Sequence, residues 1–116
     1  MRSDSLNAPP PSDPVLVVLR DRAARGSMAE ALAGAGFQVV LSDDAIDAIT
    51  WLTEHTPAVA LLDFTGAAPL GLDVLAVLRS RAHSAFEIPT IALVDDDDEA
   101  IARAATLGAD AFVRRP

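Results

Sequence analysis

The chain has 116 residues, 51% of them hydrophobic and 22% charged, a balance that fits one folded domain and excludes a disordered chain. Its formal net charge of -8 disfavours direct binding to nucleic acid or to an anionic membrane surface. Cysteine is absent, which excludes disulfides, thiol nucleophiles and thiolate metal sites.

The beginning of the chain is polar and rich in proline, with Pro9, Pro10 and Pro11 in a row. Consecutive prolines favour an extended polyproline conformation that cannot pair into a sheet. We therefore interpret residues 1–13 as a flexible leader before a single domain at 14–116. The leader lacks the apolar core of a signal peptide, and no apolar run has membrane-spanning length, so we expect a soluble cytoplasmic protein without a membrane partner.

The first strand and helix follow this leader. Residues 15–19, VLVVL, form a short apolar run of mostly β-branched side chains, which is typical of a central strand in a parallel sheet. Residues 22–35 place apolar side chains at helical spacing, and they are followed by Gly36, a residue type common where helices end. Residues 37–41, FQVVL, predict a second strand.

The middle of the chain repeats the pattern. Residues 42–44, SDD, offer N-caps for a helix that runs to about His55. Residues 58–62, AVALL, predict a third strand, and residues 71–82 predict a further helix.

Two strands and a helix are expected in the last third. Residues 89–94, PTIALV, predict a fourth strand, and residues 110–116, DAFVRRP, predict a fifth. Residues 95–109 between them predict a helix that begins with four aspartates. Four adjacent side chains cannot all face one point, and acidic residues at a helix start complement the helix dipole, so we interpret these aspartates as helix initiation rather than a cation site.

Strands that alternate with helices imply right-handed βαβ units, and therefore a parallel sheet of five strands with four helices on its faces. Ligands of such sheets lie outside the carboxyl ends of the strands, at a switch in the strand order. Functional residues are therefore expected directly after Leu19, Leu62, Val94 and Val113.

The positions at these strand ends are occupied by Arg20 and Asp21, Asp63, Val94 and Asp95, and Arg115. The aspartate that closes the third strand begins the stretch DFTGAAPLGLDVLAVLR, which is followed by the strand IPTIAL and the final segment GADAFVRRP. With these pieces in this order, residues 14–116 resemble the receiver domain of bacterial response regulators (CheY-like).

The resemblance implies a three-layer, doubly wound, flavodoxin-like α/β fold with a five-stranded parallel sheet of order 2-1-3-4-5. It places Asp63 at the phospho-acceptor position. It also matches Gly71 to the glycine before the third helix and Phe112 to the switch aromatic of the fifth strand. Since receivers take a phosphoryl group from a histidine kinase, we expect a protein partner, either such a kinase or an output domain.

The residues that would assist phosphoryl transfer depart from the family pattern. The acidic pair that holds Mg²⁺ in the family falls on Leu19 and Arg20, neither of which can bind a hard cation. The nearest carboxylate, Asp21, lies one position further on, so Asp21 and Asp63 would form at most a weak Mg²⁺ site, and we expect no cofactor. The hydroxyl position of the family is Val94, which cannot donate a hydrogen bond to a phosphoryl oxygen.

The family lysine is replaced by Arg115, which keeps the positive charge but presents a planar fork. Arg20 adds a second guanidinium near the strand ends. We therefore expect Asp63 to be held between Arg20 and Arg115 as a salt-bridged anion, in a domain locked in one state. The alternative is that Arg20 extends into solvent and Asp63 stays a free, exposed acid.

These departures predict an atypical receiver module of phosphorelay signalling that acts through protein contacts and is not an enzyme. One alternative is a conventional receiver that a histidine kinase still phosphorylates on Asp63. A remote alternative is a small α/β hydrolase with Asp63 as nucleophile, although Asp21 and Asp95 are the only other acids or bases expected at the strand ends.

The end of the sequence also differs from the family, in which a fifth helix follows the last strand. This sequence stops at Pro116. An apolar face beside the first helix would be left uncovered, and such faces are typical of binding surfaces. We expect either that the sequence is a piece of a longer regulator, or that a partner or a second copy in a homodimer covers this face.

Overall fold

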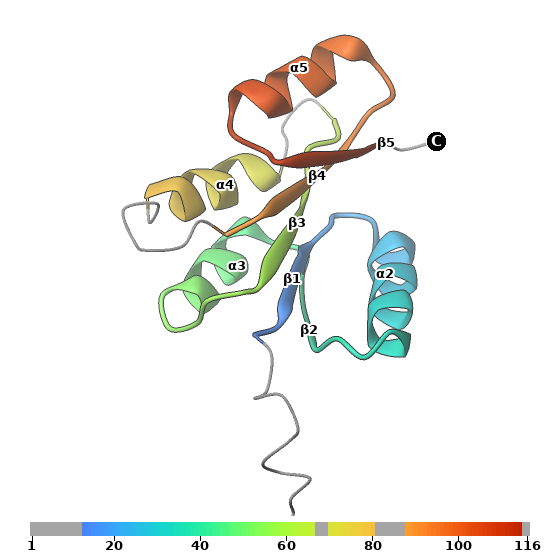
Figure 1. Cartoon of the computed structure of the whole chain (residues 1–116), viewed down its shortest axis with the longest axis vertical. Helices are drawn as coiled ribbons and strands as arrows, with labels where there is room; N and C mark the ends of the chain where they lie inside the picture. The colour runs from blue at the N-terminus through green and yellow to red at the C-terminus, as the bar shows by residue number, and fades with distance from the viewer. Residues whose placement is uncertain (1–12, 67–69, 81–87, 115–116) are drawn as a thin grey trace, which may run out of the picture.

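The computed structural model describes residues 13–66, 70–80 and 88–114, in which five strands alternate with four helices (Figure 1). The elements are β1 Val15–Val18, α2 Arg22–Gly34, β2 Val39–Ser42, α3 Ala45–Leu52, β3 Val59–Asp63, α4 Gly71–Ser80, β4 Thr90–Val94, α5 Asp98–Thr106 and β5 Ala111–Arg114. All but the last residue of the expected leader at 1–13 lie outside the described residues. Among the described residues, no helix is both long enough and apolar enough to span a bilayer.

The five strands form one parallel sheet in the order β2-β1-β3-β4-β5. This is the predicted order 2-1-3-4-5. The chain steps outward from β1 to β2 and then returns to the other side of β1 to form β3. The carboxyl ends of β1 and β3 therefore flank the switch point at which sheets of this kind bind ligands.

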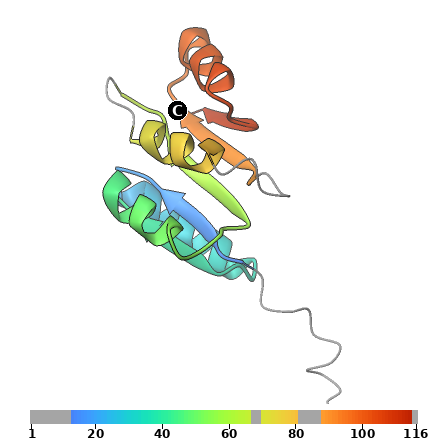
Figure 2. The ribbon, with the colours of Figure 1, turned by 90° about the vertical axis from the view of Figure 1, so that its left-hand side faces the viewer.

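Alternate strand residues face two separate apolar layers (Figures 1 and 2). Leu16 and Val18 face α3, α4 and α5 in the larger layer, whereas Val15, Val17 and Leu19 face α2 in the smaller one. This alternation follows from the two-residue period of a strand, because nearly every strand residue is apolar. The three-layer, doubly wound architecture expected from the sequence is confirmed.

Several elements are shorter than predicted, and in two of them the backbone shows why. The strand expected from Phe37 begins at Val39, because Gly36 has a φ of 96° and the N–H of Phe37 donates to Leu32 O at 3.0 Å, which closes the end of α2. The helix expected to reach His55 ends at Leu52, where the N–H of the next residue turns back to the carbonyl three positions earlier.

The four consecutive aspartates do not all start a helix. Asp97 is the N-cap of α5 and accepts a hydrogen bond from Ala100 N at 2.7 Å, so the helix begins at Asp98 rather than at Asp95. Asp95 and Asp96 precede the cap, and both make contacts to other parts of the chain. The prediction of helix initiation is therefore confirmed for Asp97 and Asp98. It does not account for Asp95 and Asp96, which contact other segments.

Gly71 brings the first turn of α4 against the end of β3. A Cβ at this position would lie 2.6 Å from Cε1 of Phe64 and 2.9 Å from the carbonyl oxygen of Asp63. Phe64 is itself buried in the larger core, so neither atom can move away easily. The close approach explains why a glycine stands before this helix.

We expect Gly71→Ala to lower the free energy of unfolding by about 1–3 kcal/mol, because the added methyl group overpacks the contact with Phe64. Gly26→Ala is the matched control, since Gly26 lies inside α2 with open space around it. The control should be neutral or stabilising by up to about 1 kcal/mol, because alanine is the better helix former. Urea denaturation measures both, and equal effects would contradict the close approach.

Candidate functional site

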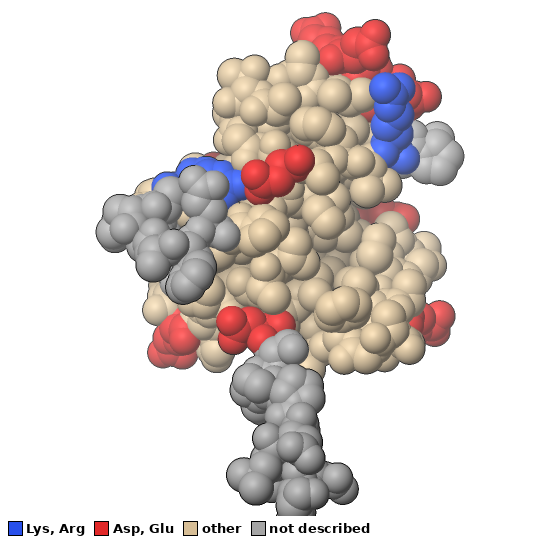
Figure 3. All heavy atoms as spheres, in the orientation of Figure 1, with Lys and Arg blue, Asp and Glu red and all other residues tan. Residues whose placement is uncertain are grey.

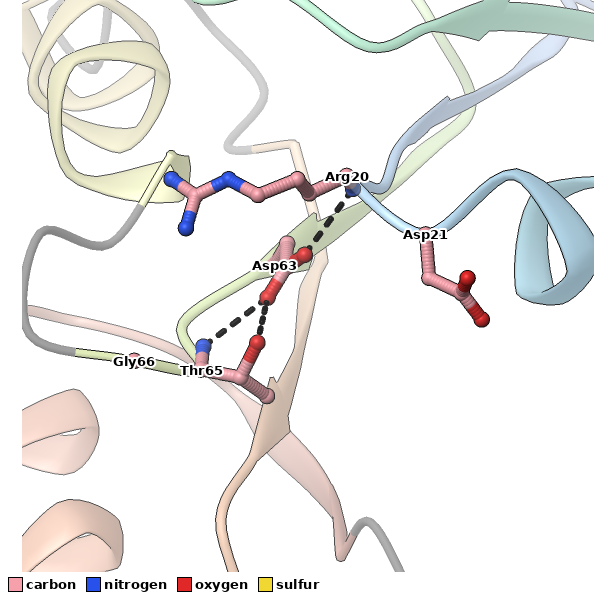
Figure 4. A pocket seen from close by; sticks show the side chains of 5 residues that line it. All are labelled: Arg20, Asp21, Asp63, Thr65 and Gly66. Atoms are coloured by element: carbon pink, nitrogen blue, oxygen red, sulfur yellow. Dashed lines mark hydrogen bonds between the residues drawn. The ribbon is translucent and has the colours of Figure 1, made fainter.

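A hollow of about 190 Å³ opens at the carboxyl ends of β1 and β3 (Figure 4). The residues that line it are Arg20, Asp21, Asp63, Thr65 and Gly66. The first two follow β1, and the other three form the end of β3 and the loop beyond it. The structure thus brings together three of the residues singled out from the sequence, Arg20, Asp21 and Asp63, at the expected edge of the sheet.

The carboxylate of Asp63 is buried, with 3% of the residue exposed, and both of its oxygens accept hydrogen bonds. Oδ2 accepts from the backbone N–H of Arg20 at 2.9 Å. Oδ1 accepts from the backbone N–H of Thr65 at 2.9 Å and from the Thr65 hydroxyl. A buried carboxylate is costly without such donors, so the chain itself supplies what this group requires.

Arg20 contacts Asp63 in a way the sequence did not predict. Its backbone amide is the donor, while its side chain extends across the hollow, with the guanidinium over Gly66 (Figure 4). Nη1 lies 3.6 Å from the Cβ that would be added at Gly66. The ion pairs within the described residues are Arg79–Asp110, Arg103–Glu99 and Arg114–Asp96.

None of these pairs in the described part of the chain joins Arg20 to Asp63, so the predicted salt bridge between their side chains is wrong. The alternative of a free, exposed Asp63 is also wrong, because that carboxylate is buried and hydrogen-bonded. Sequence reasoning assigned the contact to the charged end of Arg20, but the backbone N–H of the same residue is closer to the carboxylate, and it needs no side-chain ordering. The other expected partner of Asp63, Arg115, lies outside the described residues.

Asp21 does not turn toward Asp63. It is the N-cap of α2, its Oδ2 accepts from Ala24 N at 3.1 Å, and its carboxylate points away from the centre of the hollow (Figure 4). Leu19, at the other position of the family's acidic pair, is 1% exposed and packs in the α2-side core. With a buried leucine, an arginine and a turned-away aspartate, these residues do not fit a Mg²⁺ ion.

Gly66 and Asp95 form a contact that sequence reasoning missed. The N–H of Gly66 donates to Asp95 Oδ2 at 3.0 Å, which joins the loop after β3 to the loop after β4. Gly66 has a φ of 84°, a left-handed conformation that favours glycine. The letters DFTG indicate the turn, because an aspartate that accepts from the N–H two residues later is common in turns and glycine often follows it, but they do not indicate the contact with Asp95.

Val94 and Phe112 lie apart from the hollow. Val94 is fully buried in the larger core and does not line the hollow, so its position in the predicted pocket is corrected. Val94 and Ala92 face the same core, as the strand period requires. Phe112 lies on β5 opposite Ala92 with 37% of its surface exposed, which leaves its predicted role as a switch untested.

No protein-family model matches the chain, and no curated protein matches it. Solved structures do resemble it. A putative response regulator from Chloroflexus aurantiacus has 19% sequence identity and a TM-score of 0.78 over 90% of this chain and 86% of its own. A CheY-like receiver domain protein from Methanospirillum hungatei has 20% identity and a TM-score of 0.74 over 90% and 82%.

The chain has the fold of a response regulator receiver domain. Full-length FixJ from B. japonicum is similar in the same way, at 27% identity and a TM-score of 0.72, with 90% of this chain covering 50% of FixJ. Within the receiver fold, Asp63 ends the strand next to the switch point. The chemistry of this position depends on the hydrogen-bond donors around Asp63.

We expect Thr65→Val to lower the free energy of unfolding by about 1–3 kcal/mol, because it keeps the side-chain shape but removes a donor to a buried carboxylate. Thr106→Val is the control, since that hydroxyl donates to Ala102 O on an exposed face of α5. Its effect should stay within about 0.5 kcal/mol. Urea denaturation separates the two, and an equally mild effect at Thr65 would show that Asp63 does not depend on this hydroxyl.

Proposed function

We propose that the chain is a receiver module of two-component signalling that acts through protein contacts and does not require phosphorylation of Asp63. The observation that carries this proposal is that three donors of the chain itself, from Arg20 and Thr65, hydrogen-bond to the two oxygens of the Asp63 carboxylate. The group at the acceptor position is thereby held in place without a metal ion.

Phosphoryl transfer relies almost entirely on positioning and on neutralisation of charge. The resemblance assigns these tasks to an acidic pair with Mg²⁺, a hydroxyl residue and a lysine. Here the acidic pair is replaced by the buried Leu19 and by Arg20, and the hydroxyl by the core residue Val94. The remaining positive charge of Arg20 lies over Gly66, where it can balance Asp63 at a distance but cannot coordinate a metal.

A conventional receiver phosphorylated on Asp63 is the second candidate. It is favoured by the open hollow in front of the carboxylate and by the cationic Arg20 side chain that crosses it. A hydrolase receives less support, because Asp21 caps α2 and Asp95 accepts from Gly66, so neither carboxylate is poised as a general base beside Asp63.

We expect the chain to gain no phosphoryl group when it is incubated with acetyl phosphate, with or without Mg²⁺, and intact-mass spectrometry measures this directly. A receiver that retains the acidic pair serves as the positive control. A Mg²⁺-dependent adduct that disappears in Asp63→Asn would overturn the proposal in favour of the conventional receiver.

A second variant, Arg20→Asp, tests whether one added carboxylate restores Mg²⁺ binding. Because Leu19 beside it is apolar and buried, we expect the affinity for Mg²⁺ to rise little.

The surface we propose for protein contacts is the face of β4 and β5 that lies on the α2 side of the sheet, here called the open sheet face. Its residues are Ile91, Leu93, Ala111 and Val113, which pair across the two strands. α2 makes its main contacts with β1 and β2, and Val113 is 45% exposed. Figure 3 shows acidic side chains gathered around α5, and further acidic groups at the opposite end of the molecule.

The four residues of the open sheet face are all apolar, so an apolar partner could pack on them, and a second copy of the chain is the occupant we propose. Val113→Glu should then convert a dimer to a monomer in size-exclusion chromatography with light scattering. Phe37→Glu is the control, because Phe37 is 50% exposed but lies after α2, away from β5. A folded wild-type monomer that binds no apolar dye would contradict this surface.

A further inference from the structure

The loop between β4 and α5 is fastened at both of its sides by its own aspartates. Asp95 accepts from the N–H of Gly66 at 3.0 Å, which fastens the loop to the end of β3. Asp96 accepts from Nη1 of Arg114 at 2.7 Å, which fastens it to β5. The first contact extends the pairing of the two strands, because the last backbone bond between them runs from Phe64 N to Leu93 O at 2.8 Å.

Two consecutive backbone amides therefore each hold a carboxylate. Thr65 N donates to Asp63, and Gly66 N donates to Asp95. Consecutive N–H groups in a turn that enters the left-handed region form a concavity suited to anions. In this chain, one side chain from β3 and one from the loop after β4 fill that concavity.

The contact between Gly66 and Asp95 lies next to Val94, the position at which the resemblance predicts a hydroxyl residue. The resemblance places a hydroxyl donor at that position, which would reach an anion carried by the acid of β3. The Val94 side chain is instead buried in the core, and the next residue makes the connection with the opposite polarity. The acceptor is now on the β4 side, and the donor is the backbone of the β3 side.

We propose that Asp95 is a built-in anion that keeps the β4–α5 loop fixed to Gly66, just after β3, as a permanent replacement for a connection that would otherwise depend on a phosphoryl group. The proposal deepens the proposed function and rests on it for its regulatory meaning. A carboxylate fixed at Gly66 also adds negative charge near Asp63, which disfavours a further anion in the hollow. The loop and the start of α5 are therefore held in one arrangement.

The test measures backbone amide exchange in ¹⁵N-labelled protein by NMR, with no phosphodonor present. Asp95→Ala removes the acceptor, and we expect the Gly66 amide and the first-turn amides of α5 to exchange at least about tenfold faster, the size expected for loss of a hydrogen bond to a charged group. Asp95→Asn keeps an acceptor oxygen without the charge, so it should give an intermediate increase.

Asp96→Ala is the control variant, because it removes the neighbouring carboxylate from a pair whose side chains are 59% and 63% exposed. Its effect on the Gly66 amide should stay below about twofold. Unchanged exchange at Gly66 in Asp95→Ala would overturn the proposal. Equally faster exchange throughout β1 and β3 would overturn it as well, because it would mean a loss of global stability rather than release of one loop.

A failure of the Asp95 proposal can be distinguished from a failure of the proposed function, because the two are tested by different measurements. Phosphorylation of Asp63 by acetyl phosphate would overturn the phosphorylation-independent role, whereas the exchange of the Gly66 amide is read in unmodified protein. A phosphorylated wild type with a protected Gly66 amide would retain the Asp95 contact and reject only its role as a permanent replacement.

Discussion

The organisation of this edge of the sheet depends on one buried carboxylate, that of Asp63. A buried carboxylate must find donors, and here they come from both sides of the switch point. The N–H of Arg20 draws the segment after β1 toward β3, and the two groups of Thr65 shape the turn that leads into Gly66. The positions of both loops follow from the requirements of a single side chain.

In the function we propose, this arrangement separates the receiver fold from receiver chemistry. The carboxylate that would react is already coordinated by hydrogen bonds, and the cation beside it is a guanidinium tied to the chain. A metal ion can be gained or lost with conditions, whereas an arginine remains charged at any physiological pH. Under this proposal, charged side chains of the chain itself, Arg20 and Asp95, stand where a regulated receiver would use exchangeable ions and phosphoryl groups.

The sequence was sufficient for the architecture because its strands are almost wholly apolar and alternate with helical segments. It also located Asp63 at a strand end, since the position follows from where the apolar run stops. The contact made by Arg20 was not predictable from residue type, because every residue except proline carries the backbone N–H that does the work. The burial of Val94, by contrast, was available from the strand period, since Ala92 and Val94 share one face.

Asp95 shows a different limit of sequence reasoning. Four adjacent aspartates satisfy the preference for acids at a helix start, and that local explanation conceals a long-range one. Only the fold shows that the loop after β3 presents an unused N–H to the first of them. Within this run, Asp97 has a local role as the cap of α5, and Asp95 has a tertiary role as the contact to the segment after β3.

The stacking of Trp51 on His55, with ring centroids 4.7 Å apart and planes 9° from parallel, bears on how this protein can be observed. Trp51 is the only tryptophan, and it lies in the last turn of α3, just before the chain enters β3 at the end opposite Asp63. Its fluorescence therefore reports on the amino-terminal edge of the sheet. Events in the hollow need another optical probe. A tryptophan in place of Phe64, beside Asp63, would be close enough, but the Phe64 ring packs tightly against Gly71, so the larger ring would strain that contact.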